Sequence, residues 1–239
     1  MYTIKISHSN RLIMSNKHKH HSLLLKIAIV GECRSGKTLF CKKLTETNLS
    51  KDYVPTIALD MFILRKQIHD NINVKAHLWD TSGSKSYYSL IKSYFRACCA
   101  AIIVIDMSQT DAFEQLVKWT KELKNVKRED GQKMVFGVFI DTSNVKHDNG
   151  NDVYYQIDKF CKKENIQLYN VELRKNINIE QSMIQFLELI NSYYTFGSGT
   201  VHGLNYYTEY DDNESHTHPL LGNNGNDNGQ TINSCCSIL

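Results

Sequence analysis

Eight consecutive residues, 31–38, have the types and spacing of a phosphate-binding loop: two glycines separated by four residues, followed by Lys and Thr. Glycines in such a loop let successive backbone N–H groups point at a polyphosphate. Lys37 would contact the β- and γ-phosphate oxygens, and the hydroxyl of Thr38 would ligate Mg²⁺. The residues expected to hold the phosphates are Gly31, Cys33, Arg34, Ser35, Gly36, Lys37 and Thr38.

The residues on either side of this loop predict a strand followed by a helix. Residues 23–30 are mostly apolar, as in a buried strand, and residues 39–44 have the apolar spacing of an amphipathic helix. The N-terminus of that helix would direct its partial positive charge at the phosphates. An ordinary turn between a strand and a helix is the alternative, and this context argues against it.

The length and composition predict a single domain with appendages. The chain has 239 residues, of which 41% are apolar, enough for one hydrophobic core. No apolar run approaches the roughly 18 to 20 residues that span a bilayer, and no signal peptide is evident. The seven cysteines lack the spacing of a zinc site, so we expect free thiols buried within the predicted elements rather than disulfides.

Charge is distributed unevenly along the chain, although the formal net charge is only +3. Residues 1–175 carry a net charge of +10, whereas residues 176–239 contain no Lys or Arg and carry −7. Because the basic residues are spread over many predicted elements, we expect no nucleic-acid partner. Residues 17–21, rich in His and Lys, are expected in a solvated extension, with metal or phosphoinositide binding as alternatives.

From residue 23 to about residue 195, predicted strands alternate with predicted helices. This alternation predicts an α/β fold with a doubly wound, mostly parallel sheet, helices on both faces and one β-hairpin near residues 70–73. Ligands of such sheets bind at the carboxyl ends of the strands, where the phosphate-binding loop and Asp80 both fall. The strands are expected at 23–30, 57–68, 74–79, 100–105, 134–140 and 166–171, and the helices at 39–44, 90–98, 111–124, 154–164 and 179–194.

The expected organisation is an N-terminal extension at 1–22, one domain at 23–195 and a flexible, disordered tail at 196–239. The last four residues fit the C-a-a-X prenylation pattern, with a terminal Leu that favours geranylgeranyl. We therefore expect prenylation of Cys236 and a second lipid on Cys235, with a pair of free thiols as the alternative. One lipid chain anchors only marginally without a polybasic segment, and this tail has no Lys or Arg.

Four features follow one another in a fixed order: the phosphate-binding loop, Pro55-Thr56, Trp79-Asp80-Thr81-Ser82-Gly83 and the paired terminal cysteines. Together they resemble a Ras-superfamily small GTPase, and specifically the Rab branch. The resemblance extends over residues 23–195 and includes the segments 57–60, 93–96 and 101–106. It implies a P-loop GTPase fold, GTP and GDP as ligands, and Mg²⁺ as the metal cofactor.

This resemblance assigns roles to residues outside the phosphate-binding loop. Thr56 would join Thr38 at Mg²⁺, and Asp80 would hold the ion through water. The Gly83 amide would contact the γ-phosphate, so that the loops carrying Thr56 and Gly83 are ordered only while that phosphate is present. Core packing is the alternative role for the two aromatic residues of the effector-binding triad. By position, the triad is Met61, Trp79 and Tyr94.

The residues that would read the base depart from the family pattern. The family has Asn-Lys-x-Asp after the fifth strand, whereas the aligned residues here run from Asp141 to Asn144. An alternative register would use Lys146 and Asp148, but it needs extra residues after the strand. In the last loop only a backbone N–H contact, from Leu173, is retained. An amide at position 144 suits the oxo group of xanthine better than the amino group of guanine, so weak guanine selectivity is expected.

The residues that would support hydrolysis also depart from the pattern. Ser84 aligns with the glutamine that orients the attacking water, and its side chain is too short for that role. Cys33 stands where the family has a very small residue, which leaves room for that glutamine and an incoming arginine. Arg34 is a candidate internal source of positive charge. Slow hydrolysis is therefore expected, with Ser84 and Arg34 as the candidate catalytic positions.

These features favour a Rab-like, nucleotide-dependent switch in vesicle and membrane traffic. The implied partners are exchange and GTPase-activating factors, effectors, and prenyl transferase or escort proteins. The implied location is the cytoplasmic face of intracellular membranes through a lipid anchor, with a cytosolic pool. A pseudo-GTPase interaction module that does not cycle is the second hypothesis. An ATP-using kinase or ATPase is the third, disfavoured because no lid-like arginine cluster is evident.

Overall fold

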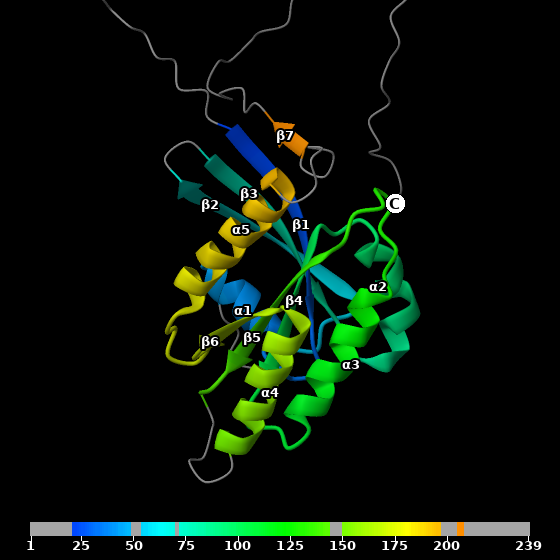
Figure 1. Cartoon of the computed structure of the whole chain (residues 1–239), viewed down its shortest axis with the longest axis vertical. Helices are drawn as coiled ribbons and strands as arrows, with labels where there is room; N and C mark the ends of the chain where they lie inside the picture. The colour runs from blue at the N-terminus through cyan, green and yellow to red at the C-terminus, as the bar shows by residue number, and fades with distance from the viewer. Residues whose placement is uncertain (1–20, 49–53, 70–71, 144–149, 197–204, 208–239) are drawn as a thin grey trace, which may run out of the picture. The chain divides into compact units, whose positions relative to one another are not determined.

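A computed structural model describes residues 21–48, 54–69, 72–143, 150–196 and 205–207, which form a seven-stranded sheet with flanking helices (Figure 1). The strand order is β2-β3-β1-β4-β5-β6, with β7 paired to β1 outside this path. Along the path every pair is parallel except β2 with β3. The strands are β1 (His21–Val30), β2 (Leu59–His69), β3 (Ile72–Thr81), β4 (Ala100–Asp106), β5 (Val135–Asp141), β6 (Gln167–Val171) and β7 (Asn205–Tyr207).

Five α-helices and one short 3₁₀ helix are found in the described residues, and the predicted fold class is confirmed. The predicted boundaries differ by a few residues: the second helix starts and ends earlier than expected, and the fourth begins at Gly150 rather than at 154. The helices are α1 (Lys37–Leu44), η1 (Lys85–Tyr87), α2 (Tyr88–Phe95), α3 (Ala112–Lys124), α4 (Gly150–Glu164) and α5 (Ile179–Phe196).

Helices cover the two faces of the sheet, and each face has its own hydrophobic core. On one face, α1 and α5 contribute buried residues such as Phe40 and Phe186, which pack against β1, β3 and β5. On the other, α2, α3 and α4 contribute Phe95, Leu116 and Ile157. The central strand β4 is buried on both faces, which is why its sequence is a continuous apolar run. This packing brings residues 31–38 to the carboxyl edge of the sheet.

The β2–β3 hairpin forms the edge of the sheet, as predicted from the polar residues between the two strands. In β3 the buried residues alternate with half-buried ones, so that Val74, Ala76 and Leu78 face the core. The side chains of Lys75, His77 and Trp79 therefore lie on the opposite, more open face. This alternation places Trp79 on the same face as its cross-strand partner Met61.

The strand β7 was not predicted from the sequence. It pairs antiparallel with Ser22–Leu24 of β1, so that the chain beyond α5 returns to the sheet. The described residues belong to one compact unit that ends at Thr208. The predicted lipidation sites Cys235 and Cys236 and the His- and Lys-rich residues 17–20 lie outside the described residues.

Five cysteines fall within the described residues, and all are free thiols. Four of them are buried, as expected for thiols inside packed elements. Cys33 is the exception: it is exposed, because it lies in the phosphate-binding loop rather than in a strand or helix. Among the described residues no helix is long and apolar enough to cross a membrane.

Candidate nucleotide-binding site

The phosphate-binding loop connects β1 to α1 and has a backbone conformation that requires glycine. Gly31 has a φ of 150°, and a Cβ at this position would lie 2.4 Å from the carbonyl oxygen of Val104. Gly36 has a φ of 92° and precedes the first residue of α1. The backbone N–H of Ser35 donates to the carbonyl oxygen of Glu32 at 3.2 Å, which closes the turn. Any other residue at position 31 would displace the neighbouring strand β4.

Lys37 is buried at the first position of α1. Its Nζ donates to the carbonyl oxygen of Glu32 at 2.7 Å and lies 3.5 Å from the hydroxyl of Ser35. Burial lowers the pKa of Lys37, and the carboxylate of Asp80 opposes that shift. The ammonium group is therefore held in the loop by acceptors that a phosphate oxygen can replace.

Three oxygen-bearing side chains from separate elements converge beside this loop. The hydroxyl of Thr38 donates to Oδ2 of Asp80 at 2.6 Å, and the hydroxyl of Thr56 donates to the same oxygen at 3.2 Å. The two hydroxyl oxygens are 3.1 Å apart. Burial raises the pKa of Asp80, while the hydrogen bond from Thr38 opposes that shift. These three residues are the predicted metal-binding set, brought together from α1, the segment before β2, and β3.

The donor set fits Mg²⁺ by its chemistry. Hydroxyl and carboxylate oxygens are the hard ligands that this ion takes, and it keeps several waters of its own. The second carboxylate oxygen of Asp80, Oδ1, is buried without a hydrogen-bond partner, as expected for a group awaiting a cation or its water. Lys37 and the first turn of α1 supply the positive charge that a polyphosphate needs alongside the ion.

Gly83 lies directly against the phosphate-binding loop. A Cβ on Gly83 would lie 2.3 Å from the backbone nitrogen of Cys33, so the glycine allows the two segments to approach. Both residues line an open pocket of about 640 Å³. Ser84 lines the same pocket with an exposed side chain, and its backbone N–H donates to the hydroxyl of Ser82 at 3.3 Å. Arg34, also in this lining, is exposed with a φ of 64°.

Ile57 and Tyr87 are among the residues of this pocket that were not predicted from the sequence to bind nucleotide. Ile57 is 76% exposed beside Thr56, although an apolar residue after the threonine was expected to begin a strand. Tyr87 belongs to η1 and reaches the pocket four residues after Gly83 along the chain. In the sequence, what pointed to these two residues was their proximity to Thr56 and Gly83, the residues predicted to contact the metal ion and the γ-phosphate.

On the base-reading side, Asp141 ties two loops together. Its Oδ1 accepts the backbone N–H of Ser143 at 3.0 Å and the backbone N–H of Leu173 at 3.1 Å. The buried side chain of Leu173 packs under Gly36, where a Cβ would lie 2.6 Å from its Cδ1. The N–H of Leu173, expected to contact the base, is thus donated to Asp141 in this structure. Asn144 lies outside the described residues.

The predicted effector triad forms one patch on the open face of the hairpin. Met61 is paired with Trp79 across the β2–β3 ladder and is 51% exposed. The rings of Trp79 and Tyr94 meet edge to face, with centroids 5.1 Å apart. Both aromatic residues are half-buried, so each also packs against the body of the domain. Juxtaposition is what the effector hypothesis requires, and the effector role itself stays a prediction.

Comparison with known proteins places these features in a family. The family model described as the Ras family matches residues 26–192. This range includes the phosphate-binding loop, most of α5, and Thr38, Thr56 and Asp80, which we call the oxygen cluster. This chain belongs to the Ras family. Being a Ras-family protein, it is a small GTP-binding switch of the Rab-like kind.

Its curated relatives in the family are distant. The Ras-related protein Rab-10 of Diplobatis ommata is 24% identical over 170 residues, which cover 71% of this chain and 82% of the relative. The Ras-related protein Rab-15 of Rattus norvegicus is 24% identical over 172 residues, covering 72% and 79%. The Ras-related protein YPTC6 of Chlamydomonas reinhardtii is 26% identical over 168 residues, covering 70% and 75%.

Proposed function

We propose that this Ras-family protein is a Rab-like switch in intracellular vesicle and membrane traffic, with slow intrinsic hydrolysis. The observation that carries the proposal is the convergence of Thr38, Thr56 and Asp80 beside the buried Lys37. Exchange factors, GTPase-activating factors and effectors are the proposed partners. The proposed location is the cytoplasmic face of intracellular membranes, with a cytosolic pool carried by escort proteins.

The oxygen cluster explains how such a switch would respond to nucleotide. Thr38 and Thr56 would ligate Mg²⁺ and Asp80 would hold it through water; the ion, when bound, neutralises charge on the phosphates. Thr56 belongs to the segment before β2, and Gly83 to the segment after β3. Because both segments reach the phosphate-binding loop, loss of a γ-phosphate would release both together. Met61 and Trp79 of the effector patch lie on the strands between those segments and Tyr94 lies on α2, after Gly83, so a partner bound there would sense the change.

The test is calorimetry of the nucleotide-free full chain with Mg²⁺ and four nucleotides: GDP, GTP, XDP and ADP. We expect binding of purine diphosphates and triphosphates, with XDP bound at least as tightly as GDP. The reason is that an amide at position 144 would offer an N–H to the 2-position of the base, and the N–H of Leu173 is donated to Asp141. Absence of binding by all four at high micromolar concentration would contradict the proposed function; a strong preference for GDP would contradict only the base assignment.

A pseudo-GTPase that holds nucleotide without cycling is the second candidate. The observation that favours it is the exposed Ser84 in the pocket, where the family has a glutamine. The two candidates differ in the nucleotide found on protein purified from its own cells. Bound GDP supports a cycling switch, whereas stably bound triphosphate or an empty site supports the pseudo-GTPase.

We further propose that the C-terminus is lipidated, with a geranylgeranyl group on Cys236 and a second lipid on Cys235. Mass spectrometry of the protein from its native cell is expected to find both modifications. Cys236→Ser is expected to abolish stable anchoring in the membrane, and Cys235→Ser to reduce it to the marginal binding of one chain. An unmodified full-length C-terminus would refute the proposal. Undiminished membrane binding by Cys235→Ser would refute only the need for a second lipid.

A further inference from the structure

A second pocket, of about 970 Å³, is larger than the nucleotide pocket. It lies under the α3–β5 loop, between the start of β5, the turn before β6 and the last turns of α5. The pocket lies where β5 and β6 begin, whereas the phosphate-binding loop lies at the carboxyl ends of the strands. We therefore call it the distal pocket. Its lining includes Val126, Lys127, Arg128, Lys133, Phe136 and Tyr193.

The distal pocket is strongly cationic. Four basic residues line it against a single carboxylate, that of Glu164. Glu164 is paired with Lys124, and Arg128 is paired with Asp130 outside the lining. The remaining cations, Lys127 and Lys133, are exposed and form no ion pair with the described part of the chain. Two ammonium groups therefore stand at the rim without an anion.

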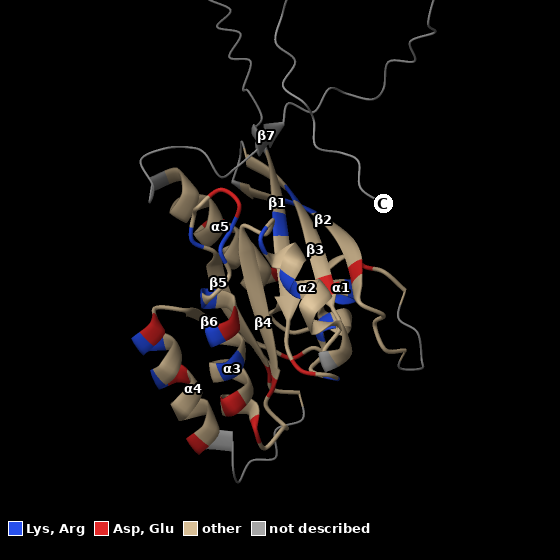
Figure 2. Ribbon diagram, turned by 90° about the vertical axis from the view of Figure 1, so that its right-hand side faces the viewer, with Lys and Arg blue, Asp and Glu red and all other residues tan. Residues whose placement is uncertain are grey.

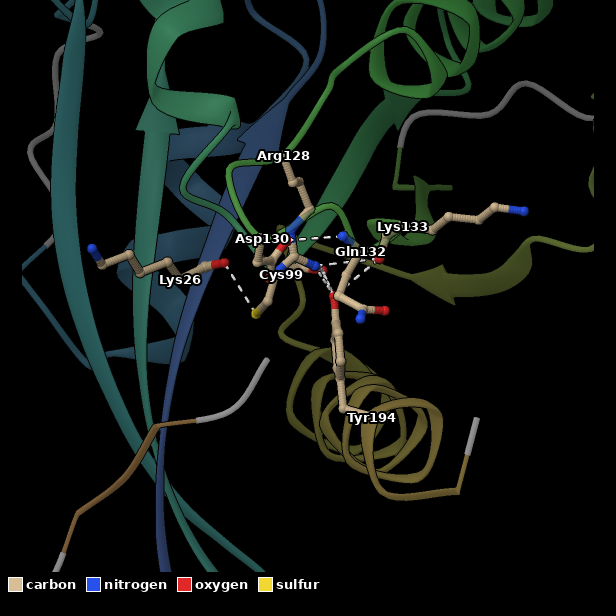
Figure 3. A network of polar contacts seen from close by, with 7 residues as sticks. All are labelled: Lys26, Cys99, Arg128, Asp130, Gln132, Lys133 and Tyr194. Atoms are coloured by element: carbon tan, nitrogen blue, oxygen red, sulfur yellow. Dashed lines mark hydrogen bonds and ion pairs between the residues drawn. The ribbon is translucent and has the colours of Figure 1, made fainter. Parts of the chain in front are cut away.

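Arg128 fixes the floor of the distal pocket (Figure 3). Its Nη1 donates to the carbonyl oxygens of Cys99 and Lys133, at 3.4 and 3.3 Å, and to the hydroxyl of Tyr194. That hydroxyl donates in turn to the carbonyl oxygen of Cys99 at 2.8 Å. The side chain of Arg128 is only 5% exposed, yet its Nε has no hydrogen-bond acceptor among the described residues. These hydrogen bonds and the ion pair with Asp130 hold the guanidinium beneath the rim of the pocket.

The walls of the distal pocket are apolar. Val126, Phe136 and Leu189 line it and are only partly buried by the rest of the chain. Tyr193 lies at the mouth, 36% exposed, in the last turn of α5. Figure 2 shows the charged residues distributed over the helices, with α3 and α4 side by side below the end of α5. A cationic rim over an apolar wall fits a ligand that is anionic at one end and apolar at the other.

The composition of the C-terminal segment limits where an electrostatic contribution to membrane binding, added to that of the two proposed lipids, can come from. A single lipid chain requires a second signal for stable anchoring, commonly a polybasic segment. From residue 176 onward there is no Lys or Arg, and α5 has no basic residue in its last turn. The distal pocket brings basic residues to the end of α5, because Tyr193 lines it and Arg128 contacts the hydroxyl of Tyr194. The domain, rather than the tail, then has to supply the electrostatic signal.

We propose that the distal pocket binds an anionic phospholipid of the membrane surface, with the headgroup phosphate at Lys127 and Lys133 and the upper acyl chain on Val126, Phe136 and Tyr193. This inference rests on the proposed membrane function and adds a second contact to the lipid anchor. Bound in this way, the domain places its distal end on the membrane and leaves the nucleotide pocket, at the carboxyl ends of the strands, on the side away from it. An acidic protein segment at the same rim is the competing occupant.

The test is co-sedimentation of the unlipidated full chain with vesicles of phosphatidylcholine alone or with about 30% phosphatidylserine, at physiological ionic strength. Wild-type protein is expected to bind the anionic vesicles at least several-fold better. Lys127→Glu with Lys133→Glu is expected to reduce that binding at least about tenfold. The matched control, Arg65→Glu with Lys75→Glu, makes the same charge change on β2 and β3 and is expected to bind nearly as wild type.

Several results would overturn this proposal. Equal losses in the two charge-reversed variants would mean attraction by net charge alone. No vesicle binding by wild-type protein would leave an acidic protein as the occupant. A soluble phosphatidylserine with short chains is expected to shift the NMR signals of Tyr193, and equal affinity for phosphoserine would show an anion site without an apolar wall. Nucleotide binding by the same samples keeps the two proposals apart, because it tests only the switch.

Discussion

Replacing Lys37 by alanine is expected to weaken the binding of GDP by about 10- to 150-fold, the loss of one charge-assisted contact to phosphate. In the structure this ammonium is held by the carbonyl oxygen of Glu32 and the hydroxyl of Ser35. Neither is a charged acceptor, so a phosphate displaces them with a net gain. Calorimetry with Mg²⁺ and GDP measures the change directly.

The control for this variant is Lys42→Ala, which removes a cation from the last turn of the same helix without touching the pocket. It is expected to bind GDP as wild type does. Thr38→Asn should also bind weakly, because it removes the hydroxyl that contacts Asp80 at 2.6 Å, and its residual binding should no longer depend on Mg²⁺. Wild-type affinity in Lys37→Ala would show that the nucleotide is bound elsewhere.

The second large effect is expected in hydrolysis. Single-turnover hydrolysis of bound triphosphate by the isolated protein should be no faster than about 10⁻⁴ s⁻¹, the scale of an unassisted Ras-type enzyme. Ser84 lies in the pocket, but its hydroxyl does not reach as far as a glutamine amide, so the attacking water is not oriented. Ser84→Gln is therefore expected to raise the rate, and Cys33→Gly to raise it further by freeing space beside Gly83.

Ser86→Gln is the matched control, since it adds the same side chain two residues away. Ser86 lies in η1, is exposed and does not line the pocket. It should leave the rate unchanged. A wild-type rate near about 10⁻² s⁻¹ would contradict the prediction and indicate an arginine acting within the same chain. Arg34 is the candidate, and loss of that rate in Arg34→Ala would identify it.

Local patterns were sufficient to predict the fold class and the phosphate-binding half of the site. The run at 100–105 predicts a strand because a parallel strand buried on both faces can carry only apolar residues. The loop at 31–38 is predictable because its glycines, Lys37 and Thr38 are contiguous. In each case the residues that act together are neighbours in the chain, and their spacing alone carries the information.

The tertiary structure decided everything that joins distant segments. Only folding brings Thr38, Thr56 and Asp80 within hydrogen-bond distance, although their identities had suggested a common role. No pattern predicted that β7 would pair with β1, because a strand of three residues is too short for its alternation of side chains to be recognised.

The bond from Leu173 to Asp141 and the distal pocket around Arg128 are also products of packing. Asp141 and Leu173 are 32 residues apart in the chain, and Arg128 and Tyr194 are 66 residues apart. A side chain buried by remote elements has its hydrogen-bond partners chosen by the fold, whereas a loop that binds phosphate through its own backbone is determined by its local sequence.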